Sequence, residues 1–408
     1  MKRLFFLNRF FLPDLSATSQ ILGSLAVDLA ESGKDVHVIT SRQLYDDPKA
    51  DLPAQEIVSG VHVHRVSSTQ FGRSALVGRG IDYLSFYASL WRCMLTLAER
   101  GDILVAMTDP PLLSILAQRA ARRRGAHLVN WWQDIYPEVA IQAGIPFLKG
   151  PIGQLVSYLR DVSLKAAKAN VVVGQRMAEE VLAHGVSSGS VHVIPNWSDD
   201  EEISSVSNAE NPLRREWGLE NKFVVGYSGN LGRAHEFDTV LAASARLRNN
   251  ADIVFVLIGG GYLVDELARS IKERRLEGTF RLIPYQDRAL LKHALCVSDV
   301  HWISLRPEFE GLIVPSKFYG IAAAGRPMIA ITAKDGEVAR LIEQHECGFV
   351  IEPGNVDALV KALVALSTDA EGRAALGGRA RAMLEAHFTR QQAIERWRDL
   401  LDTVGESD

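Results

Sequence analysis

Short apolar segments alternate with longer segments of helical periodicity along nearly the whole chain. In the first half, a strand expected at 103–107 is followed by a helix at 112–124 and a further strand at 127–132. A second series of the same kind begins at Phe223. Strands that form almost continuous apolar runs are typical of parallel sheets covered by helices on both faces. The sequence therefore predicts an α/β fold built from doubly wound, Rossmann-like sheets.

The length of the chain predicts two such sheets. A chain of 408 residues exceeds the size at which a single hydrophobic core stops growing, and the acidic, polar segment 198–211 has the composition of a linker. We expect a first domain at 1–200, a second at 201–388, and a final helix at 389–408 that can cross back to the first domain. Because ligands bind at the carboxyl ends of such strands, two facing domains would place the site in the cleft between them.

Composition excludes several classes of function. The net charge of −4 gives no case for nucleic-acid binding. The three cysteines lie far apart and form no CxxC pair, which favours a cytoplasmic protein.

The N-terminus begins like a signal peptide, but Asn8 and Arg9 interrupt its apolar stretch, so we expect a first strand there. No run of 18 apolar residues occurs, and no transmembrane helix is expected.

Two glycine-bearing turns join strands to helices in the second half, within 224–244 and 314–331. Small residues at such turns leave backbone N–H groups uncovered at the start of a helix, where they can bind a phosphate. One turn of this kind is weak evidence, since glycine turns are common between strands and helices. Two turns in one domain indicate a ligand that carries a diphosphate.

Several motifs in this order resemble those of the retaining GT-B glycosyltransferases of family 4. They are the opening LFFLNRFFLPDLSATSQILGSLAVDLAESGKDVHVIT, then VIPNW, VVGYSGNLG, VLIGGG and GFVIEPGN. The motifs WWQDIYPE, GNLG and PSKFYGIAAAGRP are similar to those of bacterial O-antigen or exopolysaccharide enzymes such as N-acetylfucosaminyl transferases. The resemblance implies transfer of a sugar from a nucleotide diphosphate sugar, expected to be UDP-linked, to a lipid-linked saccharide in lipopolysaccharide-like biosynthesis.

This chemistry requires positive charge at the departing diphosphate, whose negative charge grows as the anomeric C–O bond breaks. Without a metal, Arg and Lys side chains must stabilise that charge. Lys317 and Arg233 are the candidates, helped by backbone amides of Gly229, Asn230 and Gly232. Lys317 starts an expected helix, where a cation is unfavourable. This placement favours a bound anion over the alternative of an ordinary exposed lysine.

We assign catalytic roles to Asp134, Glu310 and Lys317. Glu310 would accept hydrogen bonds from hydroxyl groups of the donor sugar, unless it is only a solvated carboxylate in a loop. Asp134 follows a strand that ends in two tryptophans, where desolvation can raise the pKa of its carboxyl group. It would take the acceptor's proton or only position the acceptor hydroxyl, and the alternative is a helix N-cap.

The remaining site candidates follow the ends of other strands or the motifs above. The expected donor-binding residues are Gly229, Asn230, Gly232, Arg233, His235, Gly260, Tyr285, Glu308 and Ser316. The expected acceptor-binding residues are Asp14, Ser16, Thr18 and Glu138. Ser16 or Thr18 can equally be a simple N-cap, and the Tyr285 ring can equally belong to the core.

The chain departs from the family pattern at several of these positions. Asn230 and His235 stand where many members have an Arg and a Lys on the diphosphate. Leu312 and Gly320 stand where members often have two glutamates, one for the donor sugar and one for the ribose. Glu310 and Glu308 lie close enough to replace the first glutamate, and nothing nearby replaces the second. These departures keep open a nucleotide-sugar-binding subunit without catalysis, and the fold alone does not exclude a nucleotide-sugar 2-epimerase.

We expect no metal and no obligatory cofactor, because the pairs Asp46-Asp47 and Asp199-Asp200 lie in loops and look solvated. Peripheral contact with a membrane is a further expectation, since a lipid-linked acceptor lies at the membrane surface. The basic segment 119–127 and the aromatic segment 76–100 could serve that contact. Alternatively, the arginines only complement a helix dipole beside a buried helix.

Overall fold

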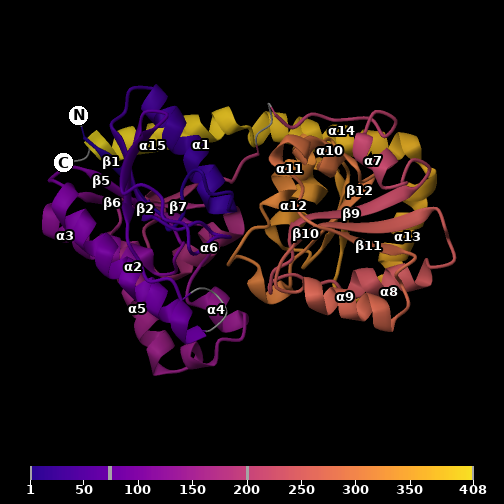
Figure 1. The fold of residues 1–408 in the computed structure, drawn as a ribbon, viewed down its shortest axis with the longest axis horizontal. Helices are drawn as coiled ribbons and strands as arrows, with labels where there is room; N and C mark the ends of the chain where they lie inside the picture. Colours follow the sequence, from indigo (N-terminus) through magenta and orange to yellow (C-terminus); the bar gives the residue numbers. More distant parts are fainter. Residues whose placement is uncertain (1, 72–75, 199–201, 407–408) are drawn as a thin grey trace. The chain divides into compact units, whose positions relative to one another are not determined.

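The computed structural model describes residues 2–71, 76–198 and 202–406, which form two compact units (Figure 1). The first unit comprises Met1–Pro195 with Ala393–Asp408, and the second comprises Asn196–Gln392. The first unit ends at Pro195 and the second begins at Asn196. The boundary expected from the sequence, between residues 200 and 201, lies outside the described residues. Asp199 and Asp200 also lie outside them.

The first unit is built on an eight-stranded sheet in which β1 occupies a central position. The strand order is β3-β4-β2-β1-β5-β6-β7-β8. The strands are β1 (Leu4–Leu7), β2 (Val36–Ser41), β3 (Gln55–Val58), β4 (Val61–Val66), β5 (Ile103–Ala106), β6 (His127–Trp132), β7 (Ala169–Val172) and β8 (Val191–Val193). All neighbouring pairs are parallel except β3 with β4. The carboxyl ends of the parallel strands therefore share one edge.

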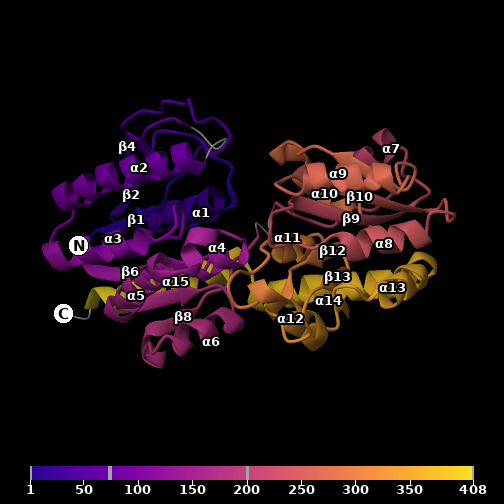
Figure 2. The same cartoon turned by 90° about the horizontal axis from the view of Figure 1, so that it is seen from below.

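Helices cover both faces of this sheet. They are α1 (Ala17–Glu31), α2 (Leu76–Leu97), α3 (Leu113–Arg124), α4 (Glu138–Gln142), α5 (Pro151–Ala166), α6 (Gln175–Ala183) and α15 (Arg390–Glu406). Figure 1 shows α1 and α15 on one side of the sheet and α2, α3 and α5 on the other, and Figure 2 shows α2, α3 and α5 in a row. The sheet is thus doubly wound, as its apolar strands predict.

The last helix of the chain completes the core of the first unit. Trp397 of α15 is fully buried, and its ring centroid lies 4.6 Å from that of Trp131, the penultimate residue of β6. Arg398 pairs with Asp28 of α1. Burial of a large aromatic side chain contributes about 1.5–3 kcal/mol, so the first unit depends on residues that follow the second unit in the sequence.

The second unit contains a six-stranded parallel sheet of order β11-β10-β9-β12-β13-β14. Its strands are β9 (Phe223–Asn230), β10 (Ile253–Gly260), β11 (Phe280–Ile283), β12 (Val300–Ser304), β13 (Met328–Ile331) and β14 (Gly348–Ile351). Its helices are α7 (Pro212–Glu216), α8 (Asp238–Arg246), α9 (Val264–Glu273), α10 (Leu291–Cys296), α11 (Lys317–Ala323), α12 (Glu337–His345), α13 (Val356–Thr368) and α14 (Ala370–His387).

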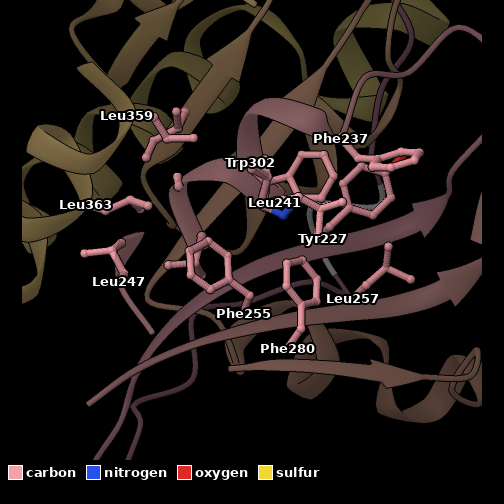
Figure 3. Close-up of a cluster of buried hydrophobic side chains, with 14 of the residues drawn as sticks. Tyr227, Phe237, Leu241, Leu247, Phe255, Leu257, Phe280, Trp302, Leu359 and Leu363 are labelled. Atoms are coloured by element: carbon pink, nitrogen blue, oxygen red, sulfur yellow. The ribbon is translucent and has the colours of Figure 1, made fainter. Parts of the chain in front are cut away.

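Two hydrophobic clusters hold these helices to opposite faces of the sheet. One contains side chains of α8, α9 and α13 together with the aromatic rings of Tyr227, Phe255 and Trp302 (Figure 3). The Tyr227 and Trp302 ring centroids are 4.4 Å apart, so the two rings pack against each other across the neighbouring strands β9 and β12. The other cluster contains side chains of α11, α12 and α14. This packing fixes α11 beside the carboxyl edge. The segment 314–331 was expected to be a strand-to-helix turn, but its glycines do not start the helix: Gly320 lies inside α11, and Gly325 (φ +63°) forms the turn from α11 to β13.

Candidate active site

An unpaired ammonium group lies at the carboxyl edge of the second-unit sheet. Lys317 begins α11, and its Nζ is 3.1 Å from Nε2 of His235 and 4.6 Å from the centroid of the Tyr227 ring. Within the described part of the chain, no acidic side chain forms an ion pair with it. Burial lowers the pKa of Lys317 to about 7. The side chain is therefore a half-buried, desolvated lysine that no carboxylate of the described residues neutralises.

The ring of His235 positions this lysine. Its Nδ1 lies 2.6 Å from the carbonyl oxygen of Ser304 and must donate a proton to it, so Nε2 accepts from the Lys317 ammonium. Burial and the nearby lysine lower the pKa of His235 to about 3, which keeps the ring neutral. We expected His235 to donate to a phosphate, but both ring nitrogens are already engaged. Its role in this structure is to orient Lys317.

Close approach of backbone explains the glycines at the ends of β9 and β10. Gly229 and Gly259 have φ angles of +120° and +142°, and a Cβ atom on Gly259 would lie 2.2 Å from the Gly229 oxygen. Only glycine fits such contacts. A Cβ atom on Gly260 would lie 3.0 Å from the ring of Tyr285, whose side chain is 62% exposed. An accessible aromatic ring thus lies beside the strand ends, where a nucleobase could stack.

The loop after β9 carries the other expected donor-binding residues. Asn230 ends β9 and its carbonyl oxygen accepts from the Tyr227 hydroxyl at 2.8 Å. Gly232 and Arg233 follow, and the Arg233 guanidinium lies 3.7 Å from the ring centroid of Tyr262. The Tyr262 side chain is itself exposed. Arg233 therefore lies in a cation–π stack at the surface of this loop.

The two loop glutamates have different surroundings. Glu308 is exposed and pairs with Arg306. Glu310 is half-buried; it accepts from the Thr332 hydroxyl and faces the backbone N–H of Glu337 at 3.4 Å, at the start of α12. A carboxylate is favourable at a helix N-terminus, so Glu310 is held in place by residues that follow β13.

Ser316 precedes Lys317 as the exposed N-cap residue of α11. Its side chain makes no capping hydrogen bond. The hydroxyl therefore does not serve the helix, and the residue keeps its place among the donor-binding candidates.

At the carboxyl edge of the first-unit sheet, Asp134 follows β6. Burial, and secondarily the charge of Asp109, raise the pKa of Asp134 to about 7. Asp109 follows the neighbouring strand β5. A carboxyl group whose pKa lies near neutrality can accept or donate a proton under ordinary conditions. The structure thus gives Asp134 the electrostatic environment that its tryptophan-rich motif suggested.

Glu138 lies four residues beyond Asp134 but is engaged in an ion pair. Its two carboxylate oxygens accept from Nη1 and Nη2 of the buried Arg160 at 2.9 and 2.8 Å. Arg160 also donates to the Tyr136 carbonyl at 3.0 Å and pairs with Asp161. We expected Glu138 to contact the acceptor. The structure instead places it in a bidentate contact that anchors the loop carrying Asp134.

The first βα loop is organised by Asp14. Its carboxylate accepts from the backbone N–H groups of Ser16 and Tyr45, and its carbonyl oxygen accepts from the Ser19 hydroxyl. Ser16 is the N-cap residue of α1, but its hydroxyl makes no capping bond and has no partner. Thr18 lies in the first turn of α1 and is half-buried. Asp14 therefore shapes the loop, and the Ser16 hydroxyl is a buried group without a partner among the described residues.

Sequence reasoning did not select several residues that hold these groups. Tyr227, Ser304 and Thr332 orient the lysine and glutamate of the second unit, and Arg160 anchors the Asp134 loop. Tyr227 lies two residues before Gly229 of the glycine turn, where an aromatic side chain beside the expected phosphate-binding loop could have been noticed. The others lie 22 or more residues from their partners in the sequence, which no local pattern reveals.

Comparison with known proteins identifies the family. Residues 17–197 match the family described as Glycosyl transferase 4-like domain, and residues 210–383 match Glycosyl transferases group 1. The chain is a glycosyltransferase of the family 4 type. It is 28% identical over 332 residues to the probable glycosyltransferase WbjE of Pseudomonas aeruginosa, covering 80% of each chain. It is 22% identical to WcaI of Escherichia coli, a protein named for glycosyl transfer in colanic acid biosynthesis, over 85% of this chain and 88% of that one.

The fold of this glycosyltransferase is the GT-B fold. Its structure is similar to that of Anabaena Alr3699/HepE in complex with UDP-glucose, with a TM-score of 0.74 and 17% identity over 99% of this chain and 100% of that chain. At this level of identity the likeness concerns the fold alone. Within the described residues, no helix is long and apolar enough to span a membrane, and no group of three or more His, Cys, Asp or Glu could hold a metal ion.

Proposed function

We propose that this glycosyltransferase moves a sugar from a UDP-linked donor to a lipid-linked saccharide during synthesis of a cell-surface polysaccharide such as O-antigen, with retention of configuration. The observation that carries the donor assignment is the ammonium group of Lys317, held by His235 and Tyr227 without an acidic partner. A diphosphate would supply that partner. The UDP-glucose complex of the HepE structure supports UDP, and the names of the relatives support polysaccharide synthesis.

In the proposed reaction the bond between the anomeric carbon and the donor phosphate oxygen breaks, and a bond to the acceptor oxygen forms on the same face. The acceptor proton passes to the departing phosphate oxygen, and UDP is released. Lys317 and the amides after β9 stabilise the negative charge of UDP as it grows. Glu310, fixed by Thr332 and the start of α12, orients hydroxyl groups of the donor sugar.

We propose that Asp134 acts on the acceptor side of this reaction. With its pKa raised to about 7, its ionised form can accept a hydrogen bond from the acceptor hydroxyl and so position that hydroxyl for attack, while the proton itself passes to the phosphate oxygen. We further propose that no metal or other cofactor is obligatory, because Lys317 supplies the charge that a metal would supply at the diphosphate. Activity should then survive an excess of EDTA.

Peripheral membrane contact would bring such an enzyme to its acceptor, and α5 offers a suitable surface. Ile152, Leu155, Tyr158 and Val162 are exposed and recur every three or four residues, so they form one apolar stripe. Exposed lysines at 149 and 165 lie at the two ends of the stripe. We propose that this α5 stripe, rather than the segments named from the sequence, contacts anionic lipid.

Binding of UDP, GDP, dTDP and ADP to the purified protein tests the donor assignment. We expect selective UDP binding that Lys317→Met weakens by about tenfold or more, because a charge-assisted contact is lost. Lys361→Met, at an exposed position of α13, is the matched control and should bind normally. Selective binding of GDP would mean that the donor sugar is linked to GDP instead of UDP. Normal UDP binding by Lys317→Met would refute the assignment of Lys317 to the donor site.

Turnover separates the transferase from the two rival functions. A transferase releases UDP together with a glycosylated acceptor when UDP-sugars and polyprenyl-linked saccharides are supplied. A 2-epimerase releases UDP and an altered sugar without any acceptor. A binding subunit takes up UDP without turnover. The proposal fails if acceptor never increases UDP release for any UDP-sugar that binds.

A further inference from the structure

A buried cation lies in the first unit, and the site described above does not use it. Arg9 is two residues beyond the end of β1, the central strand, and is only 8% exposed. Its backbone is fixed between neighbouring strands: its N–H donates to the Asp109 oxygen at 2.7 Å, and its carbonyl oxygen accepts from the Ser41 N–H at 2.9 Å. The side chain is therefore held at the carboxyl edge of the sheet.

The guanidinium group of Arg9 has few partners for a buried cation. Among the described residues its one side-chain hydrogen bond is a long one, from Nη2 to Oε1 of Gln43 at 3.4 Å, and Nε has no partner there. The rings of Phe10 and Tyr83 lie 5.2 and 4.9 Å from the guanidinium carbon. Across the described ranges no carboxylate pairs with Arg9, unlike Arg65 and Arg160, which are more deeply buried and paired with glutamates.

Two further buried polar atoms at this edge also lack partners. They are Oδ1 of Asn8, which is fully buried, and Oγ1 of Thr108, which is 7% exposed. Asn8 follows β1, and Thr108 follows β5, the strand hydrogen-bonded to it. Leaving buried donors and acceptors unpaired costs free energy, and a buried guanidinium without an anion costs more. Three such groups on adjacent strands indicate a polar ligand that carries a negative charge.

We infer that Arg9 binds a phosphate or carboxylate group of the acceptor. The inference rests on the proposed function, in which the first unit binds the acceptor saccharide. A planar guanidinium can hold either anion through two parallel hydrogen bonds, and Asn8 and Thr108 can bond the hydroxyl groups of the attached sugar. The acceptor is thus an anionic saccharide, either phosphorylated or containing a uronic acid. Asp109 and Asp134 lie at the same edge, and their carboxylates disfavour a bound anion. The positive charge of Arg9 is therefore needed for an anionic group to bind there.

Calorimetric titration of small probes into protein saturated with UDP tests this inference. The probes are glucose 1-phosphate and glucuronate, with methyl glucoside as the neutral control. We expect the wild type to bind at least one anionic probe more tightly than methyl glucoside, and the preferred probe tells which anion the acceptor carries. Arg9→Met should weaken that binding by about tenfold or more, and Arg9→Lys should restore part of it. Arg176→Met, which removes a surface arginine paired with Glu179, should change nothing.

Thermal unfolding of the same variants distinguishes a ligand-binding arginine from a structural one. Removing an unpaired buried charge should leave the unfolding midpoint of the ligand-free protein unchanged or raise it. A lower midpoint, or failure of Arg9→Met to fold, would show that Arg9 serves the fold and would overturn the inference. Unchanged probe binding in Arg9→Met would also overturn it. If Arg9→Met binds UDP more weakly than the wild type, Arg9 contributes to donor binding instead of acceptor binding. If the wild-type protein does not bind UDP at all, the proposed function itself is refuted.

Discussion

Lys317 combines two properties that suit a diphosphate site. Its ammonium group can carry a positive charge, and its lowered pKa lets a bound anion change its protonation state near neutral pH. Its pKa of about 7 reflects burial without an anion. A bound diphosphate would favour the protonated form and raise this pKa. Donor binding should therefore be coupled to proton uptake, a property that a surface lysine with an ordinary pKa would not show.

The first prediction follows from this coupling. Between pH 7 and 9 the free protein loses the Lys317 proton, so the affinity for UDP should fall by up to about tenfold for each pH unit. Calorimetry at pH 8 in buffers of different ionisation enthalpy should show uptake of up to about one proton. In Lys317→Met both effects should disappear. Affinity that is independent of pH in the wild type would contradict the assignment.

The second prediction concerns Asp134. If its ionised form acts on the acceptor, kcat should rise as pH increases through about 7, the pKa that burial and Asp109 impose. Asp134→Asn should lower kcat by about 10²-fold or more and remove this rise. UDP binding by the variant should be normal. A normal kcat in Asp134→Asn would leave the residue with a structural role only.

At the scale of elements, the ends of β9 and β10 depend on glycine. Gly259→Ala would force a Cβ atom to within 2.2 Å of the Gly229 oxygen at a positive φ angle. We expect a loss of about 1–3 kcal/mol in the free energy of unfolding, together with weaker UDP binding. Gly278→Ala, where a Cβ atom meets nothing within 4 Å, is the matched control. Denaturant unfolding of both variants measures the difference, and equal stabilities would contradict the close approach.

Elements whose residues follow a simple apolar pattern were predictable from the sequence. The strands at both cores and the helix that starts at Lys317 lie within a few residues of their expected ranges. The edge strand β3 was not expected, because its side chains alternate between exposed and half-buried and form no apolar run. Helix α5 was not expected either, since four of its apolar side chains (Ile152, Leu155, Tyr158 and Val162) are exposed, whereas the charged Arg160 is buried.

The candidate site was predictable where it depends on strand ends, and not where it depends on distant partners. Asp134 could be selected because it follows a strand whose carboxyl end lies at the ligand-binding edge, and Lys317 because a cation at the start of a helix favours a bound anion. The ion pair of Glu138 with Arg160 joins residues 22 positions apart. A sequence read one strand at a time cannot distinguish such a paired glutamate from one that is free for a ligand.

At the scale of the whole molecule, the α5 stripe leads to a prediction about location. Leu155→Glu combined with Tyr158→Glu should abolish binding to vesicles that contain phosphatidylglycerol, because it places charge within the apolar contact. Val364→Glu, which alters an exposed apolar residue of α13 in the second unit, should bind like the wild type. Co-sedimentation measures both. Wild-type protein that does not sediment with anionic vesicles would contradict the membrane proposal.

The return of the final helix to the first unit has a consequence for taking the protein apart. Because Ala393–Asp408 belong with Met1–Pro195, the second unit is topologically an insertion within the first. A fragment that stops at Pro195 lacks the indole of Trp397 against Trp131, so it should be soluble only when that helix is supplied. Fragments 1–195 and 196–408, expressed together, carry complementary parts of one core. The chain could therefore be divided into two fragments that associate when α15 of one fragment packs into the hydrophobic core of the other.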